Sequence, residues 1–132
     1  MINGLSHITI AVSDIETALS FYSDVLGFTG HVRWQSGAYL SNKDVWLCLS
    51  LDKPKPSKDY SHIAWSVDKS DFIKFSQKII NSGATQWKAN SSEGDSLYFL
   101  DPDGNKLEIH AGNLQQRLLT LRDKPYQSLE WL

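Results

Sequence analysis

Apolar and polar residues at the start of the chain follow a pattern that predicts a strand and then a helix. Residues 5–12 alternate, with apolar side chains on one face of a strand. Apolar residues then recur at helical spacing over residues 15–26, and Gly27 ends the pattern. Ser13 and Glu16 have the spacing of a capping box. Three β-rich runs complete a βαβββ unit, at residues 28–35, 38–41 and 45–51.

The same order of elements is predicted again after a linker. Residues 52–59 contain two prolines and three lysines and do not read as a strand. Residues 60–63, Tyr-Ser-His-Ile, then repeat the Leu-Ser-His-Ile of residues 5–8, and a second amphipathic helix ends at Gly83. The later elements are β-rich runs at residues 85–88, 96–101 and 106–111, and a final helix at residues 114–122.

The repeat predicts one α+β domain over residues 1–132. Its parts are a first βαβββ module (1–51), a linker (52–59), a second βαβββ module (60–111), and a C-terminal helix and tail (112–132). Neither module could bury its apolar face alone, so we expect the paired modules to join edge to edge into a curved mixed sheet with helices outside. The polar face of the strands would then line the concave side.

Composition limits the classes of partner. Hydrophobic residues make up 41% of the chain and charged residues 21%, as in globular proteins. Thirteen basic and fifteen acidic residues give a net charge of -2, which argues against binding to nucleic acid or to a membrane surface. A single cysteine, Cys48, and the lack of a basic-then-apolar leader or a long apolar run predict a cytoplasmic protein.

Metal-ligand residue types recur at matching positions of the two repeats. Superposing the repeats aligns His7 with His62, and Cys48 with Glu108, all on the polar face. Two imidazoles and one carboxylate suit several divalent ions and leave positions open for substrate, which indicates catalysis rather than structure. A strand histidine is more often an ordinary core or surface residue, and we interpret His31 in that way. His110 is interpreted likewise, as a surface residue or a neighbour of the ligands.

Residues beyond this constellation carry a family resemblance over nearly the whole chain. The segment Asn90–Gly104 resembles the fosfomycin-resistance glutathione transferases of the vicinal oxygen chelate (glyoxalase) superfamily. The specific parts of the resemblance are the loop from Asn90 to Tyr98 and the segment Trp46–Ser50, whereas the turn Asp101–Gly104 occurs across the superfamily. Supporting matches are Arg33-Trp34, Gly37–Leu40 and Arg117–Tyr126. The resemblance implies the glyoxalase fold and a homodimer that exchanges modules.

The same resemblance implies cation sites. His7 of one subunit, with His62 and Glu108 of the other, would hold Mn²⁺ in a shared active site. A loop of neutral oxygens would hold an activating K⁺, which suits a large monovalent ion. The residues that match this loop are Asn90, Ser92, Gly94, Ser96 and Tyr98.

The resemblance also implies binding sites for fosfomycin and glutathione. The phosphonate pocket is matched by three hydroxyl groups and two cations, which suit a compact dianion, and by Trp46 beside them. The hydroxyl and cationic residues are Thr9, Lys88, Ser92, Tyr98 and Arg117. The glutathione channel matches Trp34, Tyr39 and Ser50, with Tyr39 nearest the thiol. Within these sets, the residues expected to act in catalysis are Thr9, Tyr39, Lys88 and Arg117. Ser91 stands where relatives often have Arg or Lys, which would weaken capture of the glutathione carboxylates.

The mechanism that follows is addition of a thiol to a strained ring. Mn²⁺ would stabilise the alkoxide as the epoxide opens, while K⁺, Lys88 and Arg117 screen the phosphonate charge and Thr9 fixes the substrate. The thiolate would attack the carbon that bears the phosphonate. Cys48 is not needed as a nucleophile.

Several alternatives stay open from sequence. A hydrolase would open the same epoxide with water, but it needs a carboxylate base, and Asp44, the acid near the middle strands of the first unit, lies in a predicted turn. Another thiol, such as bacillithiol, could replace glutathione. A drug-sequestering protein of the same fold would need no metal. A glyoxalase or a ring-cleaving dioxygenase is a further alternative, but Cys48, at the fourth of the matched repeat positions, fits those enzymes poorly.

Overall fold

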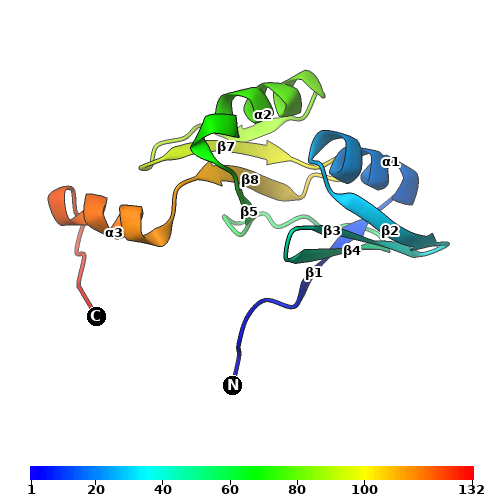
Figure 1. Cartoon of the computed structure of the whole chain (residues 1–132), viewed down its shortest axis with the longest axis horizontal. Coiled ribbons are helices and arrows are strands. Elements are labelled where there is room, and N and C mark those ends of the chain that lie inside the picture. Colours follow the sequence, from blue (N-terminus) through cyan, green and yellow to red (C-terminus); the bar gives the residue numbers. More distant parts are fainter.

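The computed structural model describes all 132 residues and has the predicted order of elements (Figure 1). Two βαβββ units are followed by a last helix. The first unit is β1 (His7–Val12), α1 (Ile15–Leu19), η1 (Ser20–Val25), β2 (Thr29–Trp34), β3 (Gly37–Asn42) and β4 (Val45–Leu51). The second is β5 (Ile63–Ser66), α2 (Lys69–Asn81), β6 (Gln86–Lys88), β7 (Asp95–Leu100) and β8 (Lys106–Ala111), and α3 (Leu114–Asp123) follows.

Each unit forms its own four-stranded mixed sheet. The strand orders are β1-β4-β3-β2 and β5-β8-β7-β6, and in each sheet the first strand runs parallel to its neighbour while the other pairs are antiparallel. The α+β class is therefore confirmed. The expectation that the two units join edge to edge is not met within one chain, because apolar residues of the first helical segment lie between the sheets and keep their edges apart.

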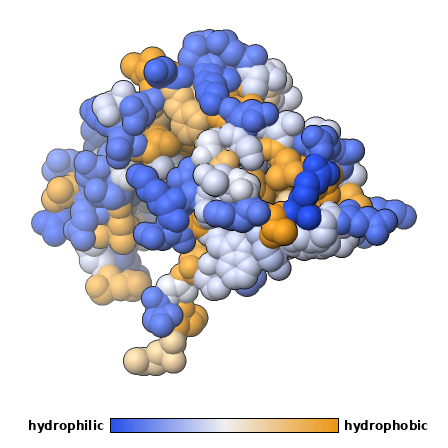
Figure 2. All heavy atoms as spheres, turned by 45° about the vertical axis from the view of Figure 1, so that its right-hand side comes forward, coloured by the Kyte–Doolittle hydropathy of each residue, from blue (hydrophilic) through white to orange (hydrophobic).

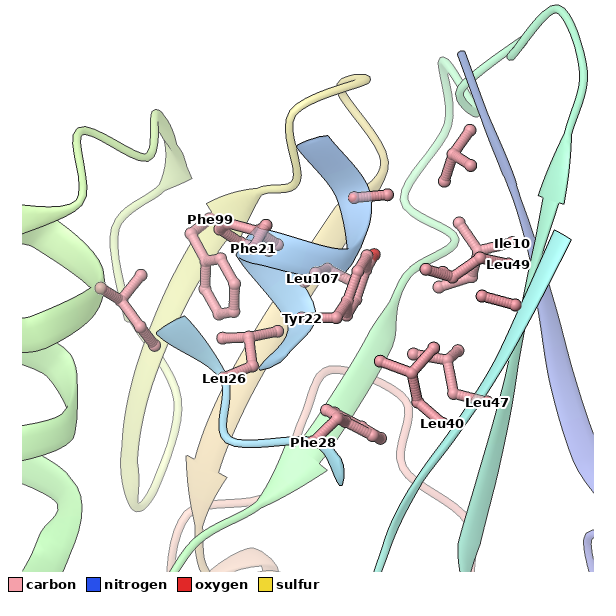
Figure 3. Packing of buried hydrophobic residues seen from close by; sticks show 14 of the residues in the cluster. Ile10, Phe21, Tyr22, Leu26, Phe28, Leu40, Leu47, Leu49, Phe99 and Leu107 are labelled. Carbon is pink, nitrogen blue, oxygen red and sulfur yellow. The ribbon is translucent and has the colours of Figure 1, made fainter. Parts of the chain in front are cut away.

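The core is one cluster of 17 buried residues that includes members of both units. Figure 3 shows Phe21 and Tyr22 between Phe99 of the second sheet and Leu47 and Leu49 of the first. The rings of Phe21 and Phe99 lie 6.3 Å apart. Burial of apolar surface from both units in one cluster joins them into a single domain.

The first helix begins one residue later than the capping box predicts. Asp14, rather than Ser13, is the N-cap, and its carboxylate accepts a hydrogen bond from the Thr17 amide at 2.8 Å. Ser13 is instead bonded through its amide and its hydroxyl to Asp103 of the second unit. After Leu19 the helix widens into a π-helical segment, and Gly27, at a φ of +83°, ends it as predicted.

The turn between β7 and β8 ties the second unit to the first. Buried Asp101 accepts hydrogen bonds from the Tyr22 hydroxyl at 2.7 Å and from the Asn105 side chain at 2.8 Å. Asn105 also donates to the Ala11 carbonyl at 3.3 Å. Together with the bonds from Ser13 to Asp103, these contacts fix the turn against three points of the first unit.

Figure 2 shows hydrophilic, intermediate and hydrophobic residues mixed over one face, with the hydrophobic residues in separate patches rather than in one band. None of the helices combines the length and the apolar character that crossing a bilayer requires.

Candidate metal and substrate site

The open face of the second sheet forms a cavity of about 690 Å³ between that sheet, the loop before β7, and α3 with the turn after it. Six predicted site residues meet there, together with polar residues that were not assigned to the site from sequence. The predicted six are His62, Lys88, Ser92, Tyr98, Glu108 and Arg117. The additional polar residues are Tyr60, Ser91, Glu93, His110, Thr120, Lys124 and Tyr126.

His62 and Glu108 face each other across the floor of the cavity. His62 Nε2 lies 2.8 Å from Glu108 Oε2, and Glu108 is only 7% exposed. His62 Nδ1 lies 2.7 Å from the Tyr60 carbonyl, which can only accept, so Nδ1 carries the hydrogen. In neutral His62 a lone pair on Nε2 then points at the carboxylate. Such an approach of two electron-rich atoms requires a proton or a metal ion between them.

Aromatic rings hold His62 in this orientation. The rings of Tyr60, Trp87 and Tyr98 lie 4.9, 5.4 and 5.9 Å from the imidazole. The Trp87 indole donates to the Leu107 carbonyl at 3.0 Å, which fixes that ring in turn. Together with the bond to the Tyr60 carbonyl, these rings fix the direction of the imidazole.

Lys88 supplies a cation at the rim of the cavity. Its ammonium donates to the Tyr60 hydroxyl at 2.7 Å and lies 4.6 and 4.8 Å from the ring centres of Tyr60 and Tyr98. The hydrogen bond from Lys88 lowers the pKa of Tyr60, and the same bond raises the pKa of Lys88. Burial raises the pKa of Tyr98, so its hydroxyl stays protonated and able to donate.

Arg117 brings a second cation from α3. Its guanidinium donates to the Glu93 carboxylate and carbonyl at 3.3 and 3.0 Å and to the hydroxyl of Tyr126 at 3.3 Å. One terminal nitrogen also lies 3.5 Å from the Ser92 hydroxyl. These contacts direct Arg117 and Ser92 toward the same part of the cavity, where an anion would meet both.

The predicted potassium loop folds back on itself. The Asn90 side chain donates to the Gly94 carbonyl at 2.8 Å and accepts from the Ser92 amide at 3.1 Å. Gly94 adopts a φ of +82°, which turns the chain into β7. The loop is thus closed by hydrogen bonds among neutral groups, and neutral oxygen atoms are the type of ligand that suits a large monovalent cation.

The remaining predicted residues lie on the first sheet and outside this cavity. His7 is exposed and stacks on Trp46 at 4.4 Å, and no group of three candidate ligands forms within one chain. Trp34, Tyr39 and Trp46 form a row of exposed rings, with centroids 4.8 and 5.3 Å apart. Thr9 is exposed beside this row and Ser50 is partly buried.

Strand register confirms the superposition of the repeats. Thr9 pairs with Cys48 in the first sheet, and Ala64 pairs with Glu108 in the second. Thr9 and Ala64 each lie two residues after one of the equivalent histidines. Their strand partners, Cys48 and Glu108, therefore occupy equivalent places in the two sheets. Asp44 lies in the turn before β4, as predicted, and does not line the cavity.

Sequence reasoning missed the residues that support the site. Tyr60 orients both His62 and Lys88, while Glu93 and Tyr126 orient Arg117. The only signal for Tyr60 is its position two residues before a repeated histidine, and its partner Lys88 lies far along the chain. Such long-range pairs carry no local pattern.

Comparison with known proteins gives a consistent set of relatives. The sequence pattern of the glyoxalase/bleomycin resistance protein/dioxygenase superfamily matches residues 4–109. The chain is 47% identical to the glutathione transferase FosA of Serratia marcescens over 98% of this chain and 95% of that protein. It is 36% identical to the metallothiol transferase FosB of Shouchella clausii, over 89% and 86% of the two chains.

Fosfomycin resistance proteins are among the solved structures with the same fold. The FosX protein of Mesorhizobium loti matches with a TM-score of 0.80 and 30% identity, over 89% of this chain and 99% of that one. A variant of FosX from Listeria monocytogenes, complexed with Mn(II) and 1S,2S-dihydroxypropylphosphonic acid, matches with a TM-score of 0.82 and 27% identity, over 90% and 99%.

Proposed function

The chain belongs to the glyoxalase/bleomycin resistance protein/dioxygenase superfamily, and we propose that it is a fosfomycin glutathione transferase that opens the epoxide of the drug and so confers resistance. The observation that carries the proposal is the approach of His62 Nε2 to Glu108 Oε2 in a cavity that is also lined by three cationic side chains, Lys88, Arg117 and Lys124. A divalent ion and a small dianion would both find their partners there.

His62 and Glu108 fit a divalent metal ion, and we assign Mn²⁺ to them, with His7 as the third ligand. The two electron-rich atoms that face each other at 2.8 Å are compatible with ligands of one ion. A metal ion bound there supplies a Lewis acid that stabilises negative charge on the epoxide oxygen. In the same proposal the loop from Asn90 to Tyr98 binds K⁺.

The chain's own residues bind and orient the phosphonate. Lys88 and Arg117 neutralise its charge, which would otherwise repel an incoming thiolate. Ser92 and Tyr98 donate hydrogen bonds from the same cavity, and Thr9 donates from the first sheet. Both carboxylates that line the cavity are engaged, because Glu93 binds Arg117 at 3.3 Å and Glu108 lies 2.8 Å from His62 Nε2, so one chain offers no free carboxylate there to activate water. This absence favours a thiol over water as the nucleophile.

A homodimer with shared sites explains why His7 lies outside the cavity. In this arrangement the first sheet of one subunit faces the second sheet of its partner, which brings His7, Thr9 and Trp46 to the other metal ligands. The exposed row of Trp34, Tyr39 and Trp46 would then be covered. Tyr39 and Trp34, with Ser50, would line the path of glutathione, and a single chain would be inactive.

The reaction is tested by mass spectrometry of fosfomycin mixed with protein, Mn²⁺, K⁺ and glutathione, with each component omitted in turn. We expect an adduct with the mass of the drug plus glutathione, lost without the metal and reduced without K⁺. A diol in the absence of thiol would indicate a hydrolase. An adduct formed only with bacillithiol would indicate another thiol transferase, and protection without any product would indicate sequestration.

The shared site is tested by mixing two inactive variants, His7→Ala and Glu108→Ala, and refolding them together. Random pairing makes half of the dimers hybrids, and each hybrid has one intact site, so about a quarter of wild-type activity should return. Sites built within one chain would give no recovery. Each variant refolded alone is the control.

A further inference from the structure

His110 lies beside the proposed metal site, yet neither the repeat nor the resemblance assigns it a role. It follows Glu108 by two residues on β8, so both side chains point to the same face of the sheet. The His110 side chain is 19% exposed and lines the cavity. Its Nδ1 lies 2.7 Å from the Ser96 hydroxyl, which in turn bonds to Glu108 Oε1 at 2.6 Å.

The direction of these hydrogen bonds follows from the number of protons. The Ser96 hydroxyl has one hydrogen, which it donates to the Glu108 carboxylate. The Ser96 oxygen must therefore accept from His110, so Nδ1 of His110 carries a hydrogen. The result is a directed chain from His110 through Ser96 to Glu108 Oε1. The other carboxylate oxygen, Oε2, is left facing His62.

Two glycines make room for the His110 ring. A Cβ atom at Gly112 would lie 2.5 Å from Nε2 of His110, and one at Gly94 would lie 2.8 Å from its Cε1. Gly94 has a positive φ and would be favoured as glycine in any case, but Gly112 does not. At Gly112 the requirement for glycine is therefore the space that His110 occupies. Both glycines therefore leave the space that this ring fills, and the hydrogen bond to Ser96 sets its direction.

We propose that His110 is a positioning residue that fixes the Glu108 carboxylate through Ser96, so that Oε2 alone is presented to the divalent ion. The proposal rests on the proposed function, because it concerns the same ion. Without the His110 donor, the Ser96 hydroxyl could turn to other acceptors and the carboxylate could rotate. Partners that orient a metal ligand in this way change metal affinity by about 10–100-fold when they are removed.

The test compares His110→Leu with His110→Asn, two side chains of similar size of which only Asn can donate near the position of Nδ1. The measurement is titration of the metal-free protein with Mn²⁺, with the free ion followed by electron paramagnetic resonance. His110→Leu should bind Mn²⁺ about 10–100-fold more weakly. His110→Asn should recover most of that loss.

The control is His31→Leu, which breaks another histidine-serine contact, the 2.6 Å bond to Ser41 on the first sheet. It should bind Mn²⁺ as the wild type does. The thermal unfolding midpoint of each metal-free variant shows whether the fold is kept. If His110→Leu does not fold, Ser96→Ala breaks the same link with His110 intact and should show the same weakening.

Equal Mn²⁺ affinity in His110→Leu and the wild type would overturn the role of His110, as would an Asn variant as weak as the Leu variant. If Ser96→Ala is the variant used, unchanged affinity has the same meaning. A wild-type protein that binds no Mn²⁺ would instead overturn the proposed function, so the two failures are distinguishable.

Discussion

The two sheets share one backbone plan but carry different chemistry on their open faces. In the second sheet His62 meets a buried carboxylate, and hydroxyls and cations surround the pair. In the first sheet the equivalent histidine, His7, is exposed and stacks on Trp46, and Cys48 occupies the place of Glu108. One module therefore provides a polar cavity, whereas the other provides an aromatic surface and the His7 imidazole.

This difference shows how a repeat can divide its tasks. The duplicated strand register places a histidine and a fourth-strand residue in fixed relation in both copies. Keeping a carboxylate in only one copy leaves coordination positions open, which a catalytic metal site needs and a structural one does not.

The largest effect on activity should come from replacing Glu108, because the first sheet has Cys48 at the matching position. Glu108→Ala should lower kcat/KM for glutathione addition by about a thousandfold or more, since the remaining imidazoles hold a divalent ion weakly. Cys48→Ala, at the matching position, should stay within about threefold of the wild type. Steady-state kinetics with saturating Mn²⁺ measures both. Full activity in Glu108→Ala would refute the metal assignment.

A second comparison concerns the cations of the second sheet. Lys88→Ala should raise the KM for fosfomycin by about 10–100-fold, the loss of one charge-assisted hydrogen bond, and should raise the concentration of K⁺ required. Lys106→Ala is the matched control, because Lys106 lies on the same sheet but outside the cavity. If Lys88→Ala changed neither the KM for fosfomycin nor the K⁺ concentration required, this result would argue against the anion site.

A third comparison concerns the bond that joins the modules. Tyr22→Phe removes the hydroxyl that donates to Asp101 and should lower the free energy of unfolding by about 1–2 kcal/mol at pH 7. Burial, and then the charge of Asp101, raise the pKa of Tyr22. The hydroxyl thus stabilises the fold below the unfolded pKa of about 10, and this contribution falls at higher pH.

Urea unfolding at pH 7 and at pH 10.5 would measure this effect. The gap between wild type and Tyr22→Phe should shrink at the higher pH, since only the wild type must keep Tyr22 protonated. A gap that stays constant would show that Tyr22 does not govern the alkaline response.

The smallest effect should come from the linker between the modules. Hydrogen bonds from the Ser57 hydroxyl and the Ser61 amide lower the pKa of Asp59 from 3.8 to about 2. Its ionised form therefore stabilises the fold above pH 3.8, and this contribution is lost as the pH falls through about 2. Asp59→Asn should have a slightly lower unfolding midpoint at pH 7 and should match the wild type near pH 2. A difference in unfolding midpoint between Asp59→Asn and the wild type that stays the same from pH 7 to pH 2 would contradict the stabilising role of the ionised Asp59.

Periodicity in the sequence was sufficient to predict most elements of the fold. Strands β4 and β8 have the predicted bounds, and both long helices end before the expected glycines, because alternation and helical spacing are local consequences of burial. The separation of the sheets was not predictable in this way. It depends on where Phe21 and Tyr22 pack, and no local pattern specifies that.

The candidate site, like the fold, could be predicted from the sequence only in part. His62 and Glu108 could be proposed from the repeat, and the structure brings them together. Tyr60 orients His62 from only two residues away, whereas Ser96 and His110 orient Glu108 through contacts between β7 and β8, and the family resemblance gave Ser96 a different role. The assignment of His7 to a shared site remains a prediction, because it depends on a second subunit.

The turn from Asp101 to Asn105 has a consequence for a site spread over two polypeptides. It clamps the second module to Ser13, Tyr22 and Ala11 of the first, and so sets the angle between the modules. His7 begins β1, whereas Ala11 and Ser13, which contact the turn, lie at the other end of that strand. A slight rotation at the turn would therefore displace the His7 imidazole by a larger distance. In the proposed homodimer, where misplacement by 1 Å can reduce a rate by about a hundredfold, a mutation in one subunit's turn would impair the chemistry in its partner's cavity.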